Sequence, residues 1–315
     1  MKVLVFSDLH VNKYKRFSEG DSRLNDCLNI LEQVYKTAND NKIDNILFCG
    51  DFFDTQYAIN TRVLTKTLEV MQKMTEKYPD IYMYGITGNH DLATREGDKY
   101  SSAISMFDTI NSINFISLDY KAARLGKDVR LIGIPYKNSE IEFSEALDEI
   151  VRNEDVSDAI LLVHQTPKKF HHTGECDEKD SRFDDFIKVF SGHIHDRDNY
   201  NYNFTMVGNP LHRDLSDAGI EKGCLIFDTA TKEIDFISFD AFYPSFVKVE
   251  QGKEDTSSER DFVVTVSSNI GNEQTDEVLS YSDTTNLENL VIQYVENELH
   301  RDDSDLVIKI GKECI

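Results

Sequence analysis

Short apolar runs alternate with amphipathic stretches over most of the chain. Residues 2–7 (KVLVFS) form a β-branched, apolar run, which predicts a buried strand. Residues 21–38 place apolar side chains three or four positions apart, which predicts a helix. The same alternation predicts further strands at 43–50, 81–87, 113–118, 129–136 and 159–164, and further helices at 60–77, 101–110 and 139–152. Strands alone follow, at 186–192, 204–208, 223–229 and 234–240.

This order of elements predicts an α/β fold. Alternating strands and helices that give way to several consecutive strands fit a four-layer αββα sandwich. In that architecture two mixed sheets pack face to face and helices flank them on both outer sides. No internal repeat is visible in the sequence.

The pattern changes near residues 241–262, where a proline and a short strand precede a polar, charged stretch. Beyond it we expect a strand at 262–268, a helix that begins at a capping box of Thr285 and Glu288, and a strand at 306–311. The chain is thus predicted to contain a large domain and a small α/β module, residues 1–245 and residues 246–315.

The protein is strongly acidic, with 57 Asp and Glu against 34 Lys and Arg and a formal net charge of −23. A surface that binds a phosphate backbone normally has surplus Lys and Arg. The C-terminal part does not supply them, because residues 241–315 contain 16 acidic and 6 basic side chains. If the substrate is a nucleic acid, bound divalent cations or a partner subunit must provide the attraction.

Neither a membrane span nor an export signal is predicted. The longest apolar run is far below the ~20 residues that cross a bilayer. Asp8 interrupts the N-terminal apolar segment before it reaches the length of a signal core. Five scattered cysteines without a CxxC pair exclude a disulfide framework and a cysteine-type zinc site. We expect a cytoplasmic protein, or one of the host cytoplasm if a phage encodes it.

Side chains that bind metal ions follow five of the predicted strands. Ligand sites of α/β folds assemble at the carboxyl ends of strands, so we expect these side chains to lie together. They are, in chain order, Asp8, His10, Asp51, Asp54, Asn89, His90, Asp91, His164, His193 and His195. The last two stand at i and i+2, which on an extended strand would direct both imidazoles to one face.

The residue types indicate two metal ions. Mixed carboxylate, imidazole and amide ligands suit Mn²⁺, Fe²⁺ or Zn²⁺. A single small ion cannot use seven ligands, whereas one bridging carboxylate would let seven residues form four bonds to each of two ions. Two ions about 3.5–4 Å apart stabilise in-line displacement at phosphorus and acidify the attacking water. The seven predicted ligands are Asp8, His10, Asp51, Asn89, His164, His193 and His195.

The motifs SDLH, CGDFFD, TGNHD, VHQ and SGHIH resemble, in this order, the five motifs of the calcineurin-like metallophosphoesterases. The resemblance implies one ion held by Asp8, His10, Asp51 and His195. It implies a second ion held by the bridging Asp51 together with Asn89, His164 and His193.

Three further residues of these motifs receive other roles from the resemblance. His90 would face the scissile phosphate and assist departure of the leaving oxygen. Asp91 would orient His90 through a hydrogen bond. Some family members have a second active-site histidine at the position of Asp54, and here we expect Asp54 to fix a metal-binding histidine from behind.

Longer stretches distinguish the branches of this superfamily. Thr55 after Asp54 and Asp91 after His90 depart from the serine/threonine phosphatase pattern. GDFFDTQ, GNHDLAT, IGIPY and above all MVGNPLHRDLSDAGIEKGCLIFDT (206–229) are similar to the SbcD-type nucleases of double-strand-break repair and recombination, including those of large phages. The resemblance covers about residues 1–245.

That resemblance implies a nuclease that uses two divalent metal ions. Mn²⁺ is the metal we expect first, and Mg²⁺, Fe²⁺ and Zn²⁺ are the alternatives. It implies 3′–5′ exonuclease activity on duplex DNA and endonuclease activity on single strands. It also implies a homodimer, an SbcC-type coiled-coil ATPase partner, and a capping domain, for which residues 246–315 have the right place. Neither metal identity, polarity, dimer geometry nor viral or cellular source follows from the residues themselves.

Two other functions remain open at this point. A phosphodiesterase or phosphatase acting on small molecules such as cyclic nucleotides would use the same metals in a deep, closed pocket. A scaffold subunit with a degenerate site is disfavoured by the intact ligand set. His171 and His172 are expected in a solvated loop, and His212 and Arg213 have no assigned role beyond their family-like segment.

Overall fold

The computed structural model describes residues 1–55, 58–92, 102–119, 121–153, 155–171, 174–199, 203–250, 261–266 and 279–280. The chain divides into two compact units, Met1–Ser245 and Phe246–Ile315. The predicted helix at Thr285 and the predicted strand at 306–311 lie outside the described residues.

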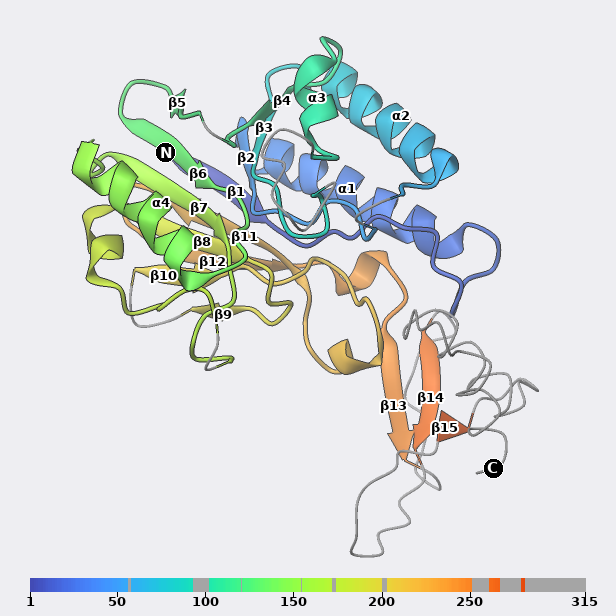
Figure 1. Ribbon diagram of the computed structural model, residues 1–315. Helices are drawn as coiled ribbons and strands as arrows, with labels where there is room; N and C mark the ends of the chain where they lie inside the picture. Colours follow the sequence, from blue (N-terminus) through green and yellow to red (C-terminus); the bar gives the residue numbers. More distant parts are fainter. Residues whose placement is uncertain are drawn as a thin grey trace, which may run out of the picture. The chain divides into compact units, whose positions relative to one another are not determined.

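The first unit contains two six-stranded mixed sheets (Figure 1). The first sheet has the order β12-β11-β1-β2-β3-β4, with β1 to β4 parallel and the edge pair β11 and β12 antiparallel. Its strands are β1 (Lys2–Phe6), β2 (Asn45–Phe48), β3 (Tyr82–Gly85), β4 (Phe115–Ser117), β11 (Gly223–Asp228) and β12 (Ile234–Ser238).

The second sheet has the order β5-β6-β7-β8-β10-β9, with antiparallel strands only at its two edges. Its strands are β5 (Ala123–Leu125), β6 (Val129–Ile134), β7 (Ala159–His164), β8 (Lys188–Gly192), β9 (Asp198–Asn199) and β10 (Phe204–Met206). All six residues of β7 are buried, as expected for a central parallel strand covered on both faces.

Four α-helices are described in the first unit: α1 (Ser22–Asp40), α2 (Thr61–Lys77), α3 (Ser105–Thr109) and α4 (Glu140–Asn153). The start of α2 is fixed by Asn60, whose side chain accepts a hydrogen bond from the backbone of Arg62. Three short 3₁₀ segments are η1 (Ser181–Asp185), η2 (Leu215–Asp217) and η3 (Asp240–Phe242).

Three separate apolar cores hold these elements together. One lies between α1, α2 and the outer face of the first sheet and includes Leu31 and Phe48. A second lies between the two sheets and includes Val5 and Leu162. The third lies between the second sheet and α4 and includes Leu147. Three cores separate four layers, so the predicted αββα fold is confirmed (Figure 1).

The sheet topology brings the functional motifs to one edge. β1, β2 and β3 run parallel in the first sheet, and β7 and β8 run parallel in the second. Each of the five motifs follows or ends one of these strands. Their loops therefore meet where the carboxyl ends of the two packed sheets come together.

The second unit contains a three-stranded sheet, β13 (Phe246–Glu250), β14 (Phe262–Val266) and β15 (Leu279–Ser280). β13 and β14 are parallel, and β15 is antiparallel to β14. The strand predicted at 262–268 is thus present as β14. Within the described residues, each helix is too short or too polar to cross a bilayer.

Candidate metal centre

Four of the seven predicted ligands have a left-handed backbone. The φ angles are +53° at Asp8, +48° at His10, +60° at Asp51 and +82° at His193. This region is unfavourable for residues other than glycine, and such strain persists only where surrounding structure enforces it. In a regular strand, successive side chains would point to opposite faces of the sheet. The left-handed turns break that alternation, so the ligand side chains point into one space.

Two glycines of the motifs allow the loops to pack this closely. A Cβ atom on Gly88 would stand 2.2 Å from Oδ1 of Asp51, and one on Gly192 would stand 2.1 Å from Oγ of Ser7. Neither distance is possible for a real side chain. Glycine at both positions is therefore a consequence of how tightly the strand ends approach each other.

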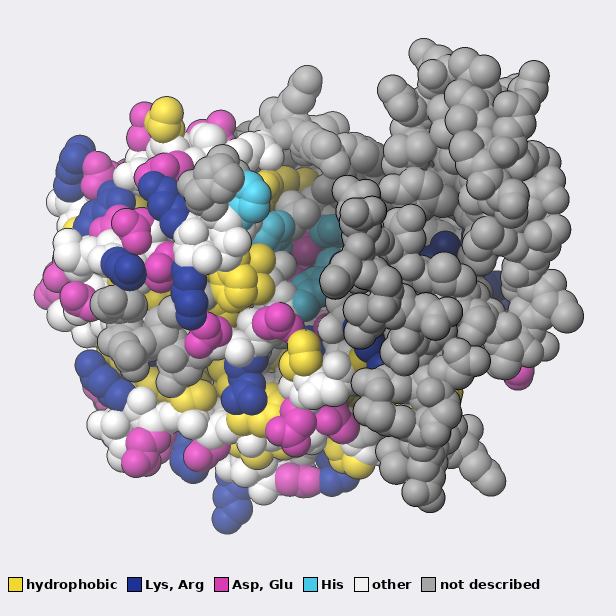
Figure 2. All heavy atoms as spheres, turned by 90° about the horizontal axis from the view of Figure 1, so that it is seen from below, with side chains coloured by type: hydrophobic (Ala, Val, Ile, Leu, Met, Phe, Trp, Pro, Cys, Tyr) yellow, Lys and Arg dark blue, Asp and Glu magenta, His cyan; other side chains and the backbone are white. Residues whose placement is uncertain are grey.

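All seven predicted ligands lie together in two clusters that share Asp51. In the first cluster, Nε2 of His10 lies 3.1 Å from Nε2 of His195, 3.6 Å from Oδ2 of Asp51 and 3.9 Å from Oδ1 of Asp8. Histidine side chains gather around acidic ones on this face of the molecule (Figure 2).

The second cluster lies on the other side of the Asp51 carboxylate. Nε2 of His164 stands 3.3 Å from Oδ2 of Asp51 and 3.1 Å from Oδ1 of Asn89. Nδ1 of His193 stands 2.8 Å from the same Asn89 oxygen and 3.3 Å from Nε2 of His164.

These separations fit ligands of a small divalent ion. Metal–ligand bonds of about 2.1 Å place neighbouring ligand atoms roughly 3.0 Å apart at octahedral angles and roughly 3.4 Å apart at tetrahedral angles. The close pairs include ring nitrogens of two histidines, 3.1 Å apart in the first cluster and 3.3 Å apart in the second. Nitrogen and oxygen lone pairs converging at these distances suit a cation between them.

Hydrogen bonds behind the histidines decide which ring nitrogen faces each cluster. Nδ1 of His164 lies 2.7 Å from the carbonyl oxygen of Cys49, which can only accept, so this nitrogen has the proton and Nε2 is left as a ligand. Nδ1 of His10 lies 3.4 Å from Oδ1 of Asp54, and Nε2 points into the cluster. The predicted placement of Asp54 behind a metal-binding histidine agrees with this contact.

Three acidic side chains are buried at the centre. Asp8, Asp51 and Asp91 are each about 1% exposed. Burial raises the pKa of Asp8 to about 7. Burial would also raise the pKa of Asp51, but the surrounding histidines, His164 first, lower it below its usual range. Burial alone would lower the pKa of His164, but Asp51 and Asp8 raise it to about 9.

The geometry of the SGHIH motif differs from the prediction. β8 ends at Gly192, and the left-handed φ of His193 breaks the extended backbone that would have aligned His193 with His195. The two imidazoles nevertheless face different clusters, as the family resemblance implied. His193 lies beside Asn89 and His164, whereas His195 lies beside His10.

Asp91 does not orient His90, and this prediction is corrected. Its carboxylate accepts four backbone N–H bonds, from Asp51, Phe52, Phe53 and Gly88, at 2.9 to 3.2 Å. Four converging donors in a buried loop require one acceptor with two oxygens, and Asp91 meets that requirement. It therefore shapes the loop that presents Asp51.

His90 is held by a different group. Its Nδ1 lies 2.7 Å from the carbonyl oxygen of Asp54, and its backbone N–H donates to Oδ1 of Asp51 at 2.8 Å. The ring stands edge-on to His10 with centroids 4.8 Å apart. His90 is half-buried, so the ring borders solvent beside the first cluster.

Several neighbours of the centre escaped sequence reasoning. The ring of Tyr136, at the end of the IGIPY motif, lies 5.7 Å from that of His193. Arg213 donates to Oδ1 of Asp54 at 2.7 Å. Lys222 donates to the carbonyl oxygen of His195 at 3.0 Å. Family-like sequence around these residues was the available signal, but their partners are distant in the chain.

Two further histidines of the described residues, His171 and His212, lie outside the two clusters. His171 is exposed, in agreement with the predicted solvated loop, and His172 lies outside the described residues. His212 is buried, and its Nε2 lies 2.9 Å from the carbonyl oxygen of Ile220.

A two-sheet sandwich with two carboxylate–imidazole clusters at its strand ends defines a metal-dependent phosphoesterase. The model of the calcineurin-like phosphoesterases matches residues 1–197, and the chain belongs to that family.

The curated proteins that this chain resembles share about a quarter of its residues over the matched segments. The DNA double-strand break repair protein Mre11 of Thermoplasma acidophilum is 25% identical over 61% of this chain and 50% of its own length. The protein of the same name from Methanosarcina mazei is 25% identical over 52% of this chain and 25% of its own length. The match thus spans half or less of these relatives.

A dimetal phosphatase from Danio rerio aligns at a TM-score of 0.41 with 8% identity over 71% of this chain and 91% of that one.

Metal binding should release a proton and strengthen as the pH rises. Without metal, His164 with a pKa of about 9 is protonated at neutral pH, and an ion must displace that proton to reach Nε2. We expect the Kd for Mn²⁺, measured by calorimetry, to fall by up to about tenfold per pH unit between pH 7 and 8.5. Equal Kd values across this range, with no proton release in buffers of different ionisation enthalpy, would contradict the assignment.

Replacing Asp91 should destabilise the fold more than a surface aspartate does. Asp91→Ala leaves four buried N–H groups without an acceptor, so we expect a loss of about 3 kcal/mol or more in the free energy of unfolding. Urea unfolding of the metal-free protein measures this loss. Asp235→Ala, at an exposed position of β12, is the control and should change stability little. Equal effects of the two substitutions would refute the loop-organising role.

Proposed function

We propose that this protein is a dinuclear-metal DNA nuclease of the SbcD type, which hydrolyses phosphodiester bonds during repair or recombination. The observation that supports this most is the pair of ligand clusters joined by Asp51, with His90 at their solvent side. Membership of the calcineurin-like phosphoesterases supports the reaction class. Similarity to double-strand break repair proteins supports DNA as the substrate.

Each of the two clusters would hold one ion. Asp8, His10 and His195 belong to one ion, Asn89, His164 and His193 to the other, and Asp51 to both. When bound, the ions would polarise phosphate oxygens and lower the pKa of a water molecule. Mn²⁺ is the proposed metal, and the donor set also suits Fe²⁺ or Zn²⁺.

His90 would serve as the general acid. The Asp54 carbonyl oxygen can only accept, so it fixes the proton of His90 on Nδ1 and leaves Nε2 to face a substrate. A proton on Nε2 can then pass to the leaving oxygen as the phosphodiester bond breaks.

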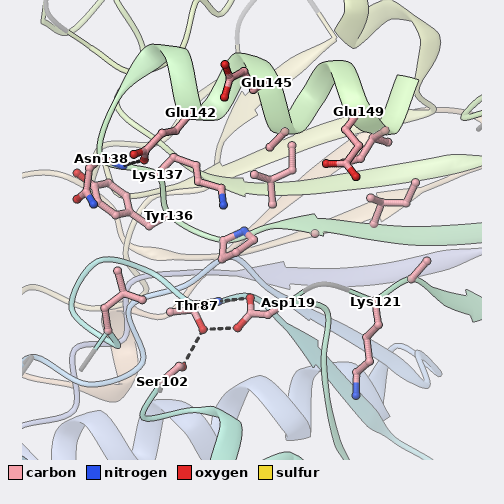
Figure 3. Close-up of a pocket in the computed structure, with 18 of the residues that line it drawn as sticks. Thr87, Ser102, Asp119, Lys121, Tyr136, Lys137, Asn138, Glu142, Glu145 and Glu149 are labelled. Carbon is pink, nitrogen blue, oxygen red and sulfur yellow. Dashed lines mark hydrogen bonds between the residues drawn. The ribbon is translucent and has the colours of Figure 1, made fainter. Parts of the chain in front are cut away.

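The alternative, a small-molecule phosphodiesterase, is less well supported by the cavity beside the centre. That cavity has a volume of about 840 Å³, and Thr87 and Tyr136 are among its lining residues (Figure 3). The Tyr136 ring connects it to the centre, because its centroid lies 5.7 Å from that of His193. Glu142, Glu145 and Glu149 of α4 line one wall. On the opposite side Asp119 accepts hydrogen bonds from the backbone and the hydroxyl of Thr87. With Lys121 and Lys137 as its two basic lining residues, the cavity has more carboxylates than ammonium groups, which disfavours the phosphate of a cyclic nucleotide.

The finer properties of the proposed nuclease rest on the family resemblance. They are 3′–5′ exonuclease activity on duplex DNA, endonuclease activity on single strands, homodimer formation, an SbcC-type ATPase partner and a capping role for residues 246–315. The net charge of −23 is consistent with a partner that supplies much of the DNA affinity.

Removing the His90 imidazole should slow cleavage strongly and leave the ions bound. His90→Ala should lower the cleavage rate of an end-labelled duplex in Mn²⁺ by about 10²- to 10⁴-fold, the usual contribution of a general acid. Mn²⁺ binding, measured by calorimetry in the same variant, should stay within a few fold of wild type because His90 is not a ligand.

His171→Ala, in the exposed loop, is the matched control and should cleave as wild type does. The nuclease proposal would be refuted if the wild-type protein left duplex and plasmid DNA uncut but hydrolysed a cyclic nucleotide. Undiminished cleavage by His90→Ala would refute only the role of His90.

A further inference from the structure

The two clusters are supported in different ways. His164 lies within β7 and is backed by a backbone carbonyl, and His193 directly follows the last residue of β8. His10 and His195 lie further from their strands, four residues after β1 and three after β8. Both of these histidines are instead backed by one segment, residues 209–222, that lies far from them in sequence.

Two cations of this segment reach the first cluster from behind. Arg213 donates to Oδ1 of Asp54 at 2.7 Å, and the same oxygen lies 3.4 Å from Nδ1 of His10. Lys222 donates to the backbone carbonyl oxygen of His195 at 3.0 Å. One cation thus acts on each histidine of the first cluster, and neither lies among the ligand atoms.

A single carboxylate, that of Asp217, connects Lys222 with the backbone of Arg213. Its Oδ1 accepts from Nζ of Lys222 at 2.7 Å, and its Oδ2 accepts from the backbone N–H of Arg213 at 2.7 Å. Arg23 of α1 holds the same segment by donating to the carbonyl oxygen of Arg213 at 3.1 Å. We call Arg213, Asp217 and Lys222 the brace.

Two side chains of the brace, Lys222 and Asp217, are buried, and their contacts offset the free-energy cost of burying charge. The side chains of Lys222 and Asp217 are 2% and 4% exposed. Burying an ammonium group is unfavourable unless good acceptors surround it, and removing one partner leaves the other uncompensated. Lys222 finds the Asp217 carboxylate, the His195 carbonyl and, at 3.6 Å, Oδ1 of Asp196. These acceptors fix the turn that presents the His195 imidazole.

We propose that Arg213, Asp217 and Lys222 are positioning residues that set the affinity of the first metal position, the one formed by Asp8, His10 and His195, and leave the second largely unaffected. Groups that orient metal ligands typically change affinity by about 10- to 100-fold when they are removed. The proposal rests on the two-ion centre proposed above. It predicts that the two ions can be lost one at a time.

Lys222→Met tests this on the full chain, with Mn²⁺ as the probe. Calorimetry on the metal-free protein should give two bound ions for wild type, whereas the variant should keep one and bind the other about 10- to 100-fold more weakly. At two equivalents of Mn²⁺, paramagnetic resonance should change from a spin-coupled pair to an uncoupled single ion. Lys188→Met replaces another buried lysine, at the start of β8, and should keep both ions.

Arg213→Met acts on the other arm of the brace and removes a half-buried side chain, so it tests the proposal even if Lys222→Met does not fold. It should give the same selective loss, through His10. Retention of both ions by the folded variants, or equal weakening of both ions, would overturn the proposal while the two-ion centre stands. A wild-type protein that binds fewer than two ions would overturn the centre and this inference together.

Discussion

The carboxylate of Asp51 lies where the two sheets, the two ligand clusters and the loop of His90 meet. It faces His10 on one side and His164 on the other, and it accepts the backbone N–H of His90. A buried carboxylate is costly unless positive charge or hydrogen-bond donors compensate it. Two bound cations would supply that charge, and the four N–H groups gathered by Asp91 fix the loop on which Asp51 stands.

The surrounding fold can be understood as the scaffold that keeps this arrangement in place. The ligand loops adopt left-handed backbone at Asp8, His10, Asp51 and His193, and three apolar cores stabilise the strands from which these loops emerge. The strain is localised at the strand ends, where the ligands must converge. Because the ligands come from both sheets, the centre depends on the packing between the sheets as much as on either sheet.

Most of the fold and the convergence of the seven candidate ligands could be predicted, because both depend on local patterns. Apolar runs marked the central strands, and polar residues directly after those runs marked the centre. The short edge strand β5 escaped prediction, since three residues give no periodicity. The role of Asp91 was predicted wrongly because its partners are backbone groups, which no side-chain motif reveals. Arg213 and Lys222 act on residues far away in the chain, and only the folded structure brings them to the centre.

The most direct test of a dinuclear centre is a crystal structure of the Mn²⁺-loaded protein with anomalous scattering recorded near the manganese edge. Our account predicts two peaks about 3.5–4 Å apart. Asp51 should lie between them, with His10 and His195 at one and His164 and His193 at the other. A single peak, or two peaks that do not share Asp51, would contradict the account.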